Sequence, residues 1–233
     1  MSTEFAPGLV IRGFTPPLKL QDFKVIAFDM DSTLINIECI DEIADAAGKK
    51  AEVSAITEAA MRGEITDFKD SLRRRVALLK GVPAAALQQV YDQRLRLNPG
   101  AQALLQAARD AGLQTLLVSG GFTYFAERVK ERLGMHEAHS NVLEIDAATG
   151  LLTGRVVGDI VDGEAKRQHL LSLCARVGCP PSQAIAVGDG ANDLPMMGEA
   201  GLSVAYHAKP KVREQAMVAI QDGGLDRLLE VLG

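Results

Sequence analysis

The sequence predicts an α/β fold, in which a doubly wound parallel sheet carries a small helical domain inserted after its first strand. Two observations support this prediction. Short apolar runs that suit buried strands alternate with helical patterns along most of the 233 residues. One segment, residues 35–97, breaks the alternation and shows helical patterns only. In sheets of this class, functional groups gather at the carboxyl edge, where the strands end.

The predicted parallel strands are continuous apolar runs, as expected for strands that are buried on both faces. They are residues 24–28, 113–118, 184–187, 202–205 and 217–220. A small hairpin is also expected, because residues 141–145 and 151–157 flank a turn-forming segment. The spacing of apolar residues between the strands predicts helices over residues 99–112, 122–133 and 165–177.

The inserted segment carries two apolar stripes at helical spacing. One lies on residues 37–47 and the other on residues 68–79, which predicts short helices that form a lid over the strand ends. We therefore expect a discontinuous catalytic core, residues 1–34 and 98–233, and a helical cap, residues 35–97.

Composition excludes several classes of protein. Hydrophobic residues at 47% and charged residues at 24% are ordinary globular values, unlike those of disordered or coiled-coil chains. The net charge of −5 argues against a general nucleic-acid binder, and no apolar run is long enough to span a membrane. Three cysteines without a CxxC pair, and an N-terminus unlike a signal peptide, predict a cytoplasmic protein.

Acidic residues follow the predicted strands. Asp29 and Asp31 end the first strand, and Asp189 and Asp193 follow the third, inside a Gly-Asp-Gly-Ala-Asn-Asp run. Taken alone, each motif has a structural alternative, since aspartates end strands and cap helices, and Asp193 could cap the next helix. Together they place several carboxylates at one edge, where like charges repel strongly. A divalent cation resolves that repulsion, and oxygen ligands favour Mg²⁺.

This set of groups suits phosphoryl transfer through an aspartyl phosphate. One carboxylate attacks phosphorus, while a metal ion and a lysine such as Lys166 offset its repulsion with the phosphate. Ser119 and Gly120, after the second strand, would hold the phosphate oxygens. A second carboxylate two residues from the first can protonate the leaving alkoxide and later accept a proton from water.

The chain resembles the haloacid dehalogenase-like (HAD) phosphohydrolase superfamily in the order of its motifs along the sequence. These motifs are Asp29-x-Asp31-x-Thr33, Ser119, Lys166 and Gly188-Asp189-x-x-x-Asp193. Within this superfamily, the chain is similar to the phosphoserine phosphatase family, because cap motifs agree with core motifs. The cap motifs are Glu38, Met61-x-Gly63, Phe68 and residues 71–76. The resemblance runs from about residue 25 to residue 219.

The resemblance implies a Mg²⁺-dependent hydrolase of L-phosphoserine, a small-molecule substrate, with an aspartyl-phosphate intermediate. It also implies a role for each matching residue. Asp29 corresponds to the nucleophile and Asp31 to the general acid/base, and the Mg²⁺ ligands correspond to Asp29, the backbone carbonyl of Asp31 and Asp189, with Asp193 in or near the second shell of the metal. The residues that bind the phosphate group correspond to Ser119, Gly120 and Lys166. Asn192 corresponds to a residue that positions the substrate, and Glu38 and Arg75 correspond to the groups that bind its amino-acid part.

Two other functions remain open from the sequence. The chain could be a HAD phosphatase or phosphotransferase for another small phosphomonoester, or a receiver-like signalling domain that is phosphorylated on an aspartate. A receiver needs no cap to enclose a small substrate, so the inserted segment counts against it. Without the resemblance, Glu38 would be assigned to a solvated acidic helix face and Arg75 to a basic surface run, residues 73–75.

Overall fold

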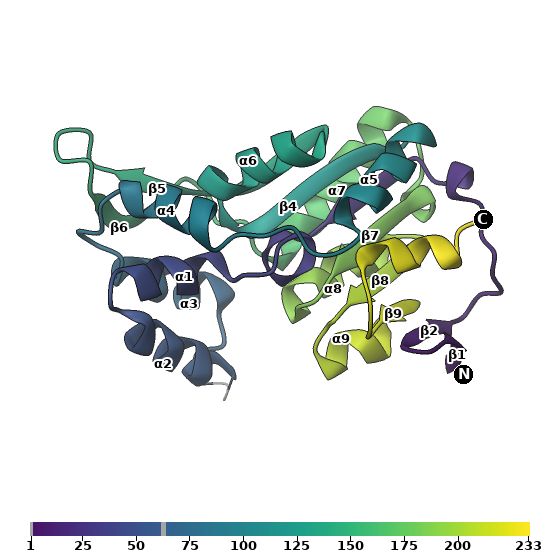
Figure 1. Ribbon diagram of the computed structural model, residues 1–233, viewed down its shortest axis with the longest axis horizontal. Helices are drawn as coiled ribbons and strands as arrows, with labels where there is room; N and C mark the ends of the chain where they lie inside the picture. The colour runs from purple at the N-terminus through teal and green to yellow at the C-terminus, as the bar shows by residue number, and fades with distance from the viewer. Residues whose placement is uncertain (1, 62–63) are drawn as a thin grey trace.

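The computed structural model describes residues 2–61 and 64–233, without the side chains of residues 60 and 61. The expected motif Met61-x-Gly63 therefore lies outside the described side chains. Within the described residues, a nine-stranded sheet has the order β1-β2-β9-β8-β7-β3-β4-β5-β6 (Figure 1). The predicted α/β class with a mainly parallel sheet is confirmed.

The parallel part of the sheet runs from β9 to β5, with β3 between β7 and β4. These strands are β3 (Val25–Phe28), β4 (Gln114–Phe122), β5 (Glu137–Ile145), β7 (Ala184–Gly188), β8 (Leu202–Tyr206) and β9 (Val218–Ile220). The predicted hairpin is also present, because the second half of β5 pairs antiparallel with β6 (Leu152–Val157). Its first half pairs parallel with β4, so β5 begins earlier than the sequence predicts.

The sequence analysis missed a second antiparallel element. Strands β1 (Ser2–Ala6) and β2 (Leu9–Arg12) form an N-terminal hairpin, and β2 pairs with β9 at the opposite edge of the sheet from β6. Four of the five residues of β1 are exposed, so this strand has no continuous apolar run of the kind that marks the inner strands.

Helices cover both faces of the sheet. On one face, α5 (Ala101–Asp110) and α6 (Thr123–Leu133) pack against alternate residues of the central strands, such as Phe28 and Leu117. On the other, α7 (Gly163–Val177), α8 (Leu194–Glu199) and α9 (Pro210–Gln215) pack against the intervening residues, such as Ala27 and Val118. None of the helices in the described part of the chain is both long and apolar enough to cross a membrane.

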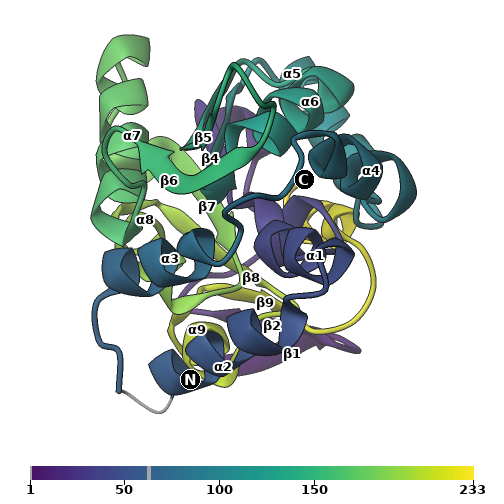
Figure 2. The same ribbon diagram turned by 90° about the vertical axis from the view of Figure 1, so that its left-hand side faces the viewer.

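Between β3 and α5 the chain forms α1 (Cys39–Ala46), α2 (Lys50–Met61), α3 (Phe68–Ala77) and α4 (Ala85–Gln93). We call residues 35–97 the helical insertion. Figure 1 shows it at the left-hand end of the sheet, and in Figure 2, which looks onto that end, α1 and α3 lie in front of the strands. Its loop at residues 81–84 bonds to the β5–β6 hairpin, since Gly81 N and Leu152 N donate to the carbonyls of Leu152 and Val82, both at 2.8 Å.

Candidate active site

The turn after β3 places two aspartates at the sheet edge. Asp29 continues the strand, since its N–H donates to the carbonyl of Val187 at 3.0 Å, and the chain then turns within Met30–Leu34. Ser32 adopts a left-handed conformation (φ 57°) inside this turn. Asn98, the first residue after the helical insertion, holds the turn through Nδ2, which donates to the carbonyls of Thr33 (2.8 Å) and Ile35 (3.0 Å).

Lys166 joins the carboxylates that follow two different strands. It lies near the start of α7 and is fully buried, and its Nζ donates to Asp29 Oδ1 (2.6 Å) and Asp193 Oδ1 (2.7 Å). Burial acts to lower the pKa of Lys166, but the two carboxylates outweigh it and the pKa is raised. A fixed positive charge therefore lies beside the Asp29 carboxylate.

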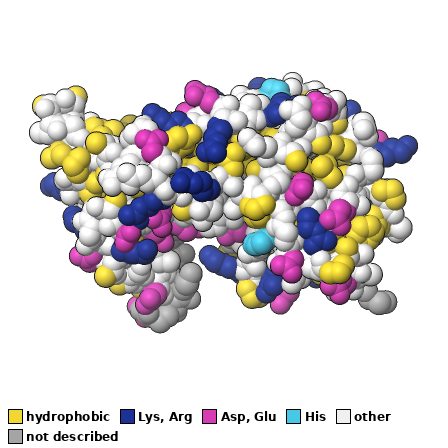
Figure 3. Space-filling view, in the orientation of Figure 1, with side chains coloured by type: hydrophobic (Ala, Val, Ile, Leu, Met, Phe, Trp, Pro, Cys, Tyr) yellow, Lys and Arg dark blue, Asp and Glu magenta, His cyan; other side chains and the backbone are white. Residues whose placement is uncertain are grey.

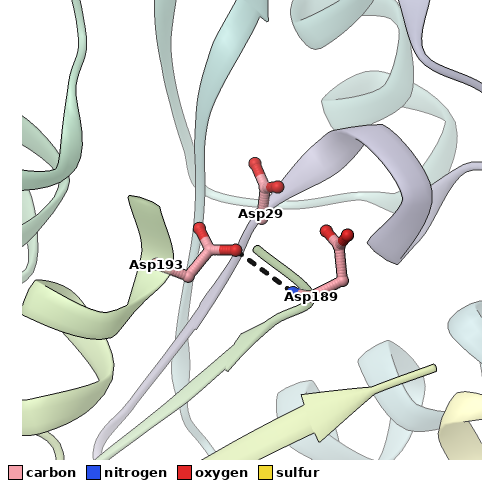
Figure 4. A group of neighbouring side chains, drawn as sticks. All are labelled: Asp29, Asp189 and Asp193. Carbon is pink, nitrogen blue, oxygen red and sulfur yellow. Dashed lines mark hydrogen bonds between the residues drawn. The ribbon is translucent and has the colours of Figure 1, made fainter. Parts of the chain in front are cut away.

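Asp193 organises the loop after β7. Its Oδ2 accepts hydrogen bonds from the N–H groups of Asp189 (3.1 Å) and Gly190 (3.0 Å), and the first of these bonds is drawn in Figure 4. Gly188 packs so closely on the Asp193 carboxylate that a β-carbon at this position would overlap it. Asp193 makes no side-chain cap on α8, so the helix-capping alternative is wrong.

Three carboxylates are arranged as a cation site. Asp29, Asp189 and Asp193 each offer one oxygen, and these oxygens lie within 4.8 Å of one another (Figure 4). Asp189 Oδ1 also accepts a hydrogen bond from Thr33 Oγ1 (3.2 Å), which links the two strand ends. Donors that are all oxygen suit a hard divalent cation. Because both oxygens of Asp193 already accept hydrogen bonds, Asp29 and Asp189 are the better placed to bind an ion.

The acidic groups perturb one another. Burial, followed by the charge of Asp193, raises the pKa of Asp29, against the opposing effect of Lys166. Burial and the same neighbour raise the pKa of Asp189 to about 7. For Asp31, burial and the charge of Glu38 raise the pKa to about 7. The edge of the sheet thus concentrates negative charge that a bound cation would offset.

The end of β4 forms a compact polar loop. The buried Ser119 accepts a hydrogen bond on Oγ from the N–H of Gly121 (2.9 Å). A β-carbon on Gly121 would lie 3.2 Å from Asp31 Oδ2, so glycine lets this loop approach the acid. The buried Asn141 fixes Gly120, because its Nδ2 donates to the Gly120 carbonyl and its Oδ1 accepts from Val161 N, both at 2.8 Å.

The start of α3 packs against this loop. Phe68 lies against Gly120, where a β-carbon would be 2.9 Å from Phe68 Cζ. The next residue, Lys69, forms an ion pair with Asp162 (3.1 Å), and Asp162 also caps α7 by accepting from Ala165 N (2.9 Å). The helical insertion is therefore anchored to the helix that carries Lys166. Figure 3 shows a notch between the insertion and the sheet, with charged side chains along it.

Glu38 and Arg75 belong to the helical insertion. Glu38 is exposed at the start of α1 and accepts a hydrogen bond from Ser32 Oγ (2.6 Å). Arg75 is half-buried on α3, and burial lowers its pKa, opposed by the charges of Asp41, Glu38 and Asp31. Asp31 itself accepts a hydrogen bond from Cys39 N (3.1 Å). The structure thus brings both residues into the electrostatic environment of Asp31.

The remaining expected residue is Asn192, half-buried in the loop after β7 with its side chain packed against Gly190. Sequence reasoning missed several residues that hold the site together: Asn98, Asn141, Lys69 and Asp162. Each is a single polar residue whose partner lies far away in the chain, so no local spacing marks it.

Comparisons with known proteins agree with this geometry. Residues 23–201 match the family model for haloacid dehalogenase-like hydrolases. The chain is 70% identical over 234 residues to a phosphoserine phosphatase of Polaromonas sp., covering 99% of this chain and 98% of the relative. It is 65% identical to a phosphoserine phosphatase of Albidiferax ferrireducens, covering 98% of both chains.

Solved structures are also similar. A phospho-aspartyl intermediate analogue of a phosphoserine phosphatase and a substrate-bound phosphoserine phosphatase complex each superpose with a TM-score of 0.83 and 38% identity, covering 91% of this chain and 99% of theirs. A probable phosphoserine phosphatase of Vibrio cholerae, in unliganded form, superposes with a TM-score of 0.81 and 45% identity, covering 93% of this chain and 66% of that one.

Proposed function

Because the chain belongs to the haloacid dehalogenase-like hydrolases and groups with the phosphoserine phosphatases among them, we propose that it hydrolyses L-phosphoserine to L-serine and phosphate. The observation that carries this proposal is the position of Asp29. It is a nearly buried carboxylate, 2.6 Å from the ammonium of Lys166 and grouped with Asp189 and Asp193. A carboxylate held in this way suits nucleophilic attack on phosphorus.

The proposed cofactor is Mg²⁺. Asp29, the backbone carbonyl of Asp31 and Asp189 would hold it, while Asp193 fixes Lys166 and the loop behind them. The fit rests on a donor set made of oxygens and on the raised pKa of Asp29 and Asp189, which burial and then the negative charge of Asp193 cause and which a cation would oppose. When bound, the ion would offset the negative charges of the attacking carboxylate and the phosphate.

In the first step, an oxygen of Asp29 bonds to phosphorus and the bond from phosphorus to the serine oxygen breaks. Asp31 donates a proton to the departing alkoxide. A pKa of about 7 for this carboxyl, raised by burial and by Glu38, suits a group that must be protonated at neutral pH. Lys166 keeps its charge throughout, because two carboxylates hold its pKa up.

In the second step, water replaces the aspartyl oxygen. Asp31, now deprotonated, accepts a proton from the water that attacks phosphorus, and the bond between phosphorus and Asp29 breaks. Phosphate leaves and both carboxyl groups return to their initial states. We propose that Ser119 and the backbone at Gly120 bind the phosphate oxygens. Asn141 and Phe68 hold the loop that contains these two residues in place.

The helical insertion would bind the amino-acid part of the substrate. Glu38 would pair with the ammonium group and Arg75 with the carboxylate, which an arginine can bind through two parallel hydrogen bonds. Asn192, at the edge of the same loop as Asp189, would help to position the substrate. We place the reaction in the cytoplasm, since the three cysteines are free thiols that suit a reducing compartment.

The test is release of phosphate from L-phosphoserine by the purified protein with Mg²⁺, beside a panel of small phosphomonoesters. We expect many turnovers per protein molecule, a preference for L-phosphoserine, and reversible loss of activity on chelation. A preference for another phosphomonoester would contradict the substrate. Phosphorylation that stops after one equivalent would instead favour the receiver-like alternative.

A further inference from the structure

Ser32 adopts a backbone conformation that serine rarely takes. Its φ is 57° and its ψ is 0°, inside the turn that leads from β3 to the helical insertion. Among the described residues, His207 is the other non-glycine residue with a positive φ. Glycine takes this conformation without steric cost, whereas the β-carbon of a serine makes it unfavourable. A serine at such a position, directly after the proposed acid Asp31, needs an explanation.

The hydroxyl of Ser32 contacts the residue that would bind the ammonium group of the substrate. Ser32 Oγ donates to Glu38 Oε1 at 2.6 Å, a short hydrogen bond of the kind that a hydroxyl forms with a carboxylate. The N–H of Ser32 donates to the carbonyl of Ile37 at 3.2 Å, so the backbone closes the same loop. In the described part of the chain, the Glu38 carboxylate accepts no other hydrogen bond. Because Glu38 is exposed, its second oxygen remains accessible to an ammonium group.

The side chain of Glu38 does not cap its own helix. Glu38 directly precedes α1, where an acceptor side chain can bind the first N–H groups of the helix, but it makes no such bond. The N–H of Cys39, the first residue of α1, donates instead to Asp31 Oδ2 (3.1 Å). The start of α1 therefore binds Asp31, and the Glu38 carboxylate is held by Ser32.

The chemistry of the substrate makes the relative position of Asp31 and Glu38 important. In L-phosphoserine, the leaving oxygen and the ammonium group are on adjacent carbon atoms. Asp31 would protonate that oxygen while Glu38 binds the ammonium, so the two carboxyl groups must be held in a fixed relation to each other. Ser32 follows Asp31 in the chain and bonds to Glu38, so it links the two groups directly.

We propose that Ser32 is a positioning residue for Glu38: its hydroxyl holds one oxygen of the carboxylate and so places the other for the ammonium group of the substrate. Ser32 lies on the turn between the sheet edge and the insertion, and through Glu38 it serves the insertion. This role rests on the proposed function, because it requires a substrate with an ammonium group beside the phosphate ester.

The test compares two substrates in the variants Ser32→Gly and Ser32→Ala. The second substrate, 3-phosphonooxypropanoate, carries the phosphate and carboxylate of L-phosphoserine but lacks its ammonium group. In both variants, kcat/KM on L-phosphoserine should fall about three- to tenfold, mainly through KM, which is the size expected for one lost hydrogen bond. The value on 3-phosphonooxypropanoate should stay within about twofold.

The two variants separate the hydroxyl from the backbone. Glycine accepts the left-handed conformation, so Ser32→Gly should unfold at a higher temperature than Ser32→Ala, although their losses on L-phosphoserine are equal. A loss in Ser32→Ala that is absent from Ser32→Gly would show that the backbone matters and not the hydroxyl, which overturns the role of Ser32. His207→Gly is the matched control, since it places glycine at the other positive φ and should leave the ratio of the two substrates unchanged.

A double variant tests whether Ser32 acts through Glu38. In a Glu38→Gln background, Ser32→Gly should change kcat/KM on L-phosphoserine by less than about twofold, because the carboxylate that the hydroxyl holds is no longer present. Full additivity of the two substitutions, or equal losses on both substrates, would overturn the role of Ser32.

The proposed function fails differently. A wild-type protein without preference for L-phosphoserine contradicts that function, and the role of Ser32 with it. A normal wild-type preference, with equal losses on the two substrates in Ser32→Gly, contradicts the role of Ser32 alone. Should thermal unfolding show that Ser32→Ala does not fold, Ser32→Gly becomes the decisive variant, since glycine adopts the conformation of this turn without strain. Its loss must then be confined to L-phosphoserine.

Discussion

The catalytic edge of the sheet and the helical insertion differ in how their buried charged groups are paired. At the sheet edge, Lys166 is fully buried and hydrogen-bonded to Asp29 and Asp193. In the insertion, Arg75 and Asp41 carry buried atoms that no described residue satisfies. The edge holds its lysine in buried ion pairs and has one buried side-chain atom, Asp31 Oδ1, without a partner among the described residues, whereas the insertion has such atoms on both Arg75 and Asp41. We infer that the sheet edge performs the chemistry and the insertion selects the substrate.

The energetics of the two regions should differ accordingly. Removing one partner from a buried ion pair leaves an uncompensated charge and typically costs about 3–5 kcal/mol. The ion pair that joins the two regions, Lys69 with Asp162, is partly exposed (39% and 23%). Pairs of this kind contribute at most about 1 kcal/mol. Substitutions at the sheet edge should affect every substrate, to an extent that depends on its leaving group, and substitutions in the insertion should affect only substrates that carry the amino-acid part.

The largest expected effect is that of Asp29→Asn. An amide cannot displace a phosphoryl donor, so turnover should fall by at least about 10³-fold on L-phosphoserine and on nitrophenyl phosphate alike. Steady-state phosphate release measures it, with circular dichroism to show that the variant is folded. More than about 1% of wild-type turnover would contradict Asp29 as the nucleophile.

Asp31→Asn should come next. The loss on L-phosphoserine should be about 10²- to 10⁴-fold, because the serine alkoxide is a poor leaving group that needs a proton. Nitrophenolate needs little protonation, so the loss on nitrophenyl phosphate should be clearly smaller. Equal losses on the two esters, measured as kcat, would show that Asp31 has another role.

Glu38→Gln and Arg75→Lys test whether the helical insertion selects the substrate. Glu38→Gln leaves the ammonium of the substrate without its charged partner, which typically costs about 2–5 kcal/mol, or roughly thirty- to several thousandfold in kcat/KM on L-phosphoserine. Arg75→Lys keeps a positive charge and loses only the two parallel hydrogen bonds to the carboxylate, so its loss should be smaller. Glu42→Gln, which affects an acid bonded to Arg94, is the control that should change little. Wild-type kinetics in both variants would mean that this pair does not bind the amino-acid part.

A weaker effect is expected where the two regions meet. Lys69→Ala breaks the ion pair with Asp162 and should raise KM for L-phosphoserine by about two- to fivefold, because the pair is partly exposed. Arg74→Ala is the matched control, since Arg74 pairs with Asp70 inside the same helix. Equal KM values for the two variants would show that the Lys69 pair does not hold the insertion over the site.

The smallest effect concerns stability. Because burial raises the pKa of Asp31 and of Asp189 from 3.8 to about 7, these groups stabilise the metal-free protein at low pH, and that contribution is lost as the pH rises through 7. Mg²⁺ binds the deprotonated form. The increase in Tm on adding Mg²⁺ should therefore grow by about 2–6 °C between pH 5 and 7.5. Asp189→Asn should largely remove this dependence, and a pH-independent increase would contradict it.

The sequence predicted the parallel strands well because each is a buried apolar run between helices. It missed the β1–β2 hairpin, since Phe5 and its neighbours in β1 are largely exposed and the hairpin is held by pairing with β9, far away in the chain. The first half of β5 was missed for a related reason, because its residues 137–140, Glu-Ala-His-Ser, do not form an apolar run.

The site was predictable to the extent that topology determines it. Parallel strands must bring Asp29, Ser119 and Asp189 to one edge, so their order along the chain was informative. Glu38 and Arg75 could be assigned to substrate binding only through the resemblance, because an apolar stripe on a helix does not indicate which of its polar residues lie at the site.

The most direct test of this division of roles is competition between L-phosphoserine and nitrophenyl phosphate in one reaction. The ratio of serine to nitrophenol formed gives the ratio of the two kcat/KM values and is independent of the amount of active protein. Ser119→Ala, at the sheet edge, should keep this ratio within about threefold of wild type, whereas Glu38→Gln should lower it by about thirtyfold or more and Arg75→Lys by a smaller factor that still exceeds threefold. An unchanged ratio in both insertion variants, or an equally large change in Ser119→Ala, would contradict the account.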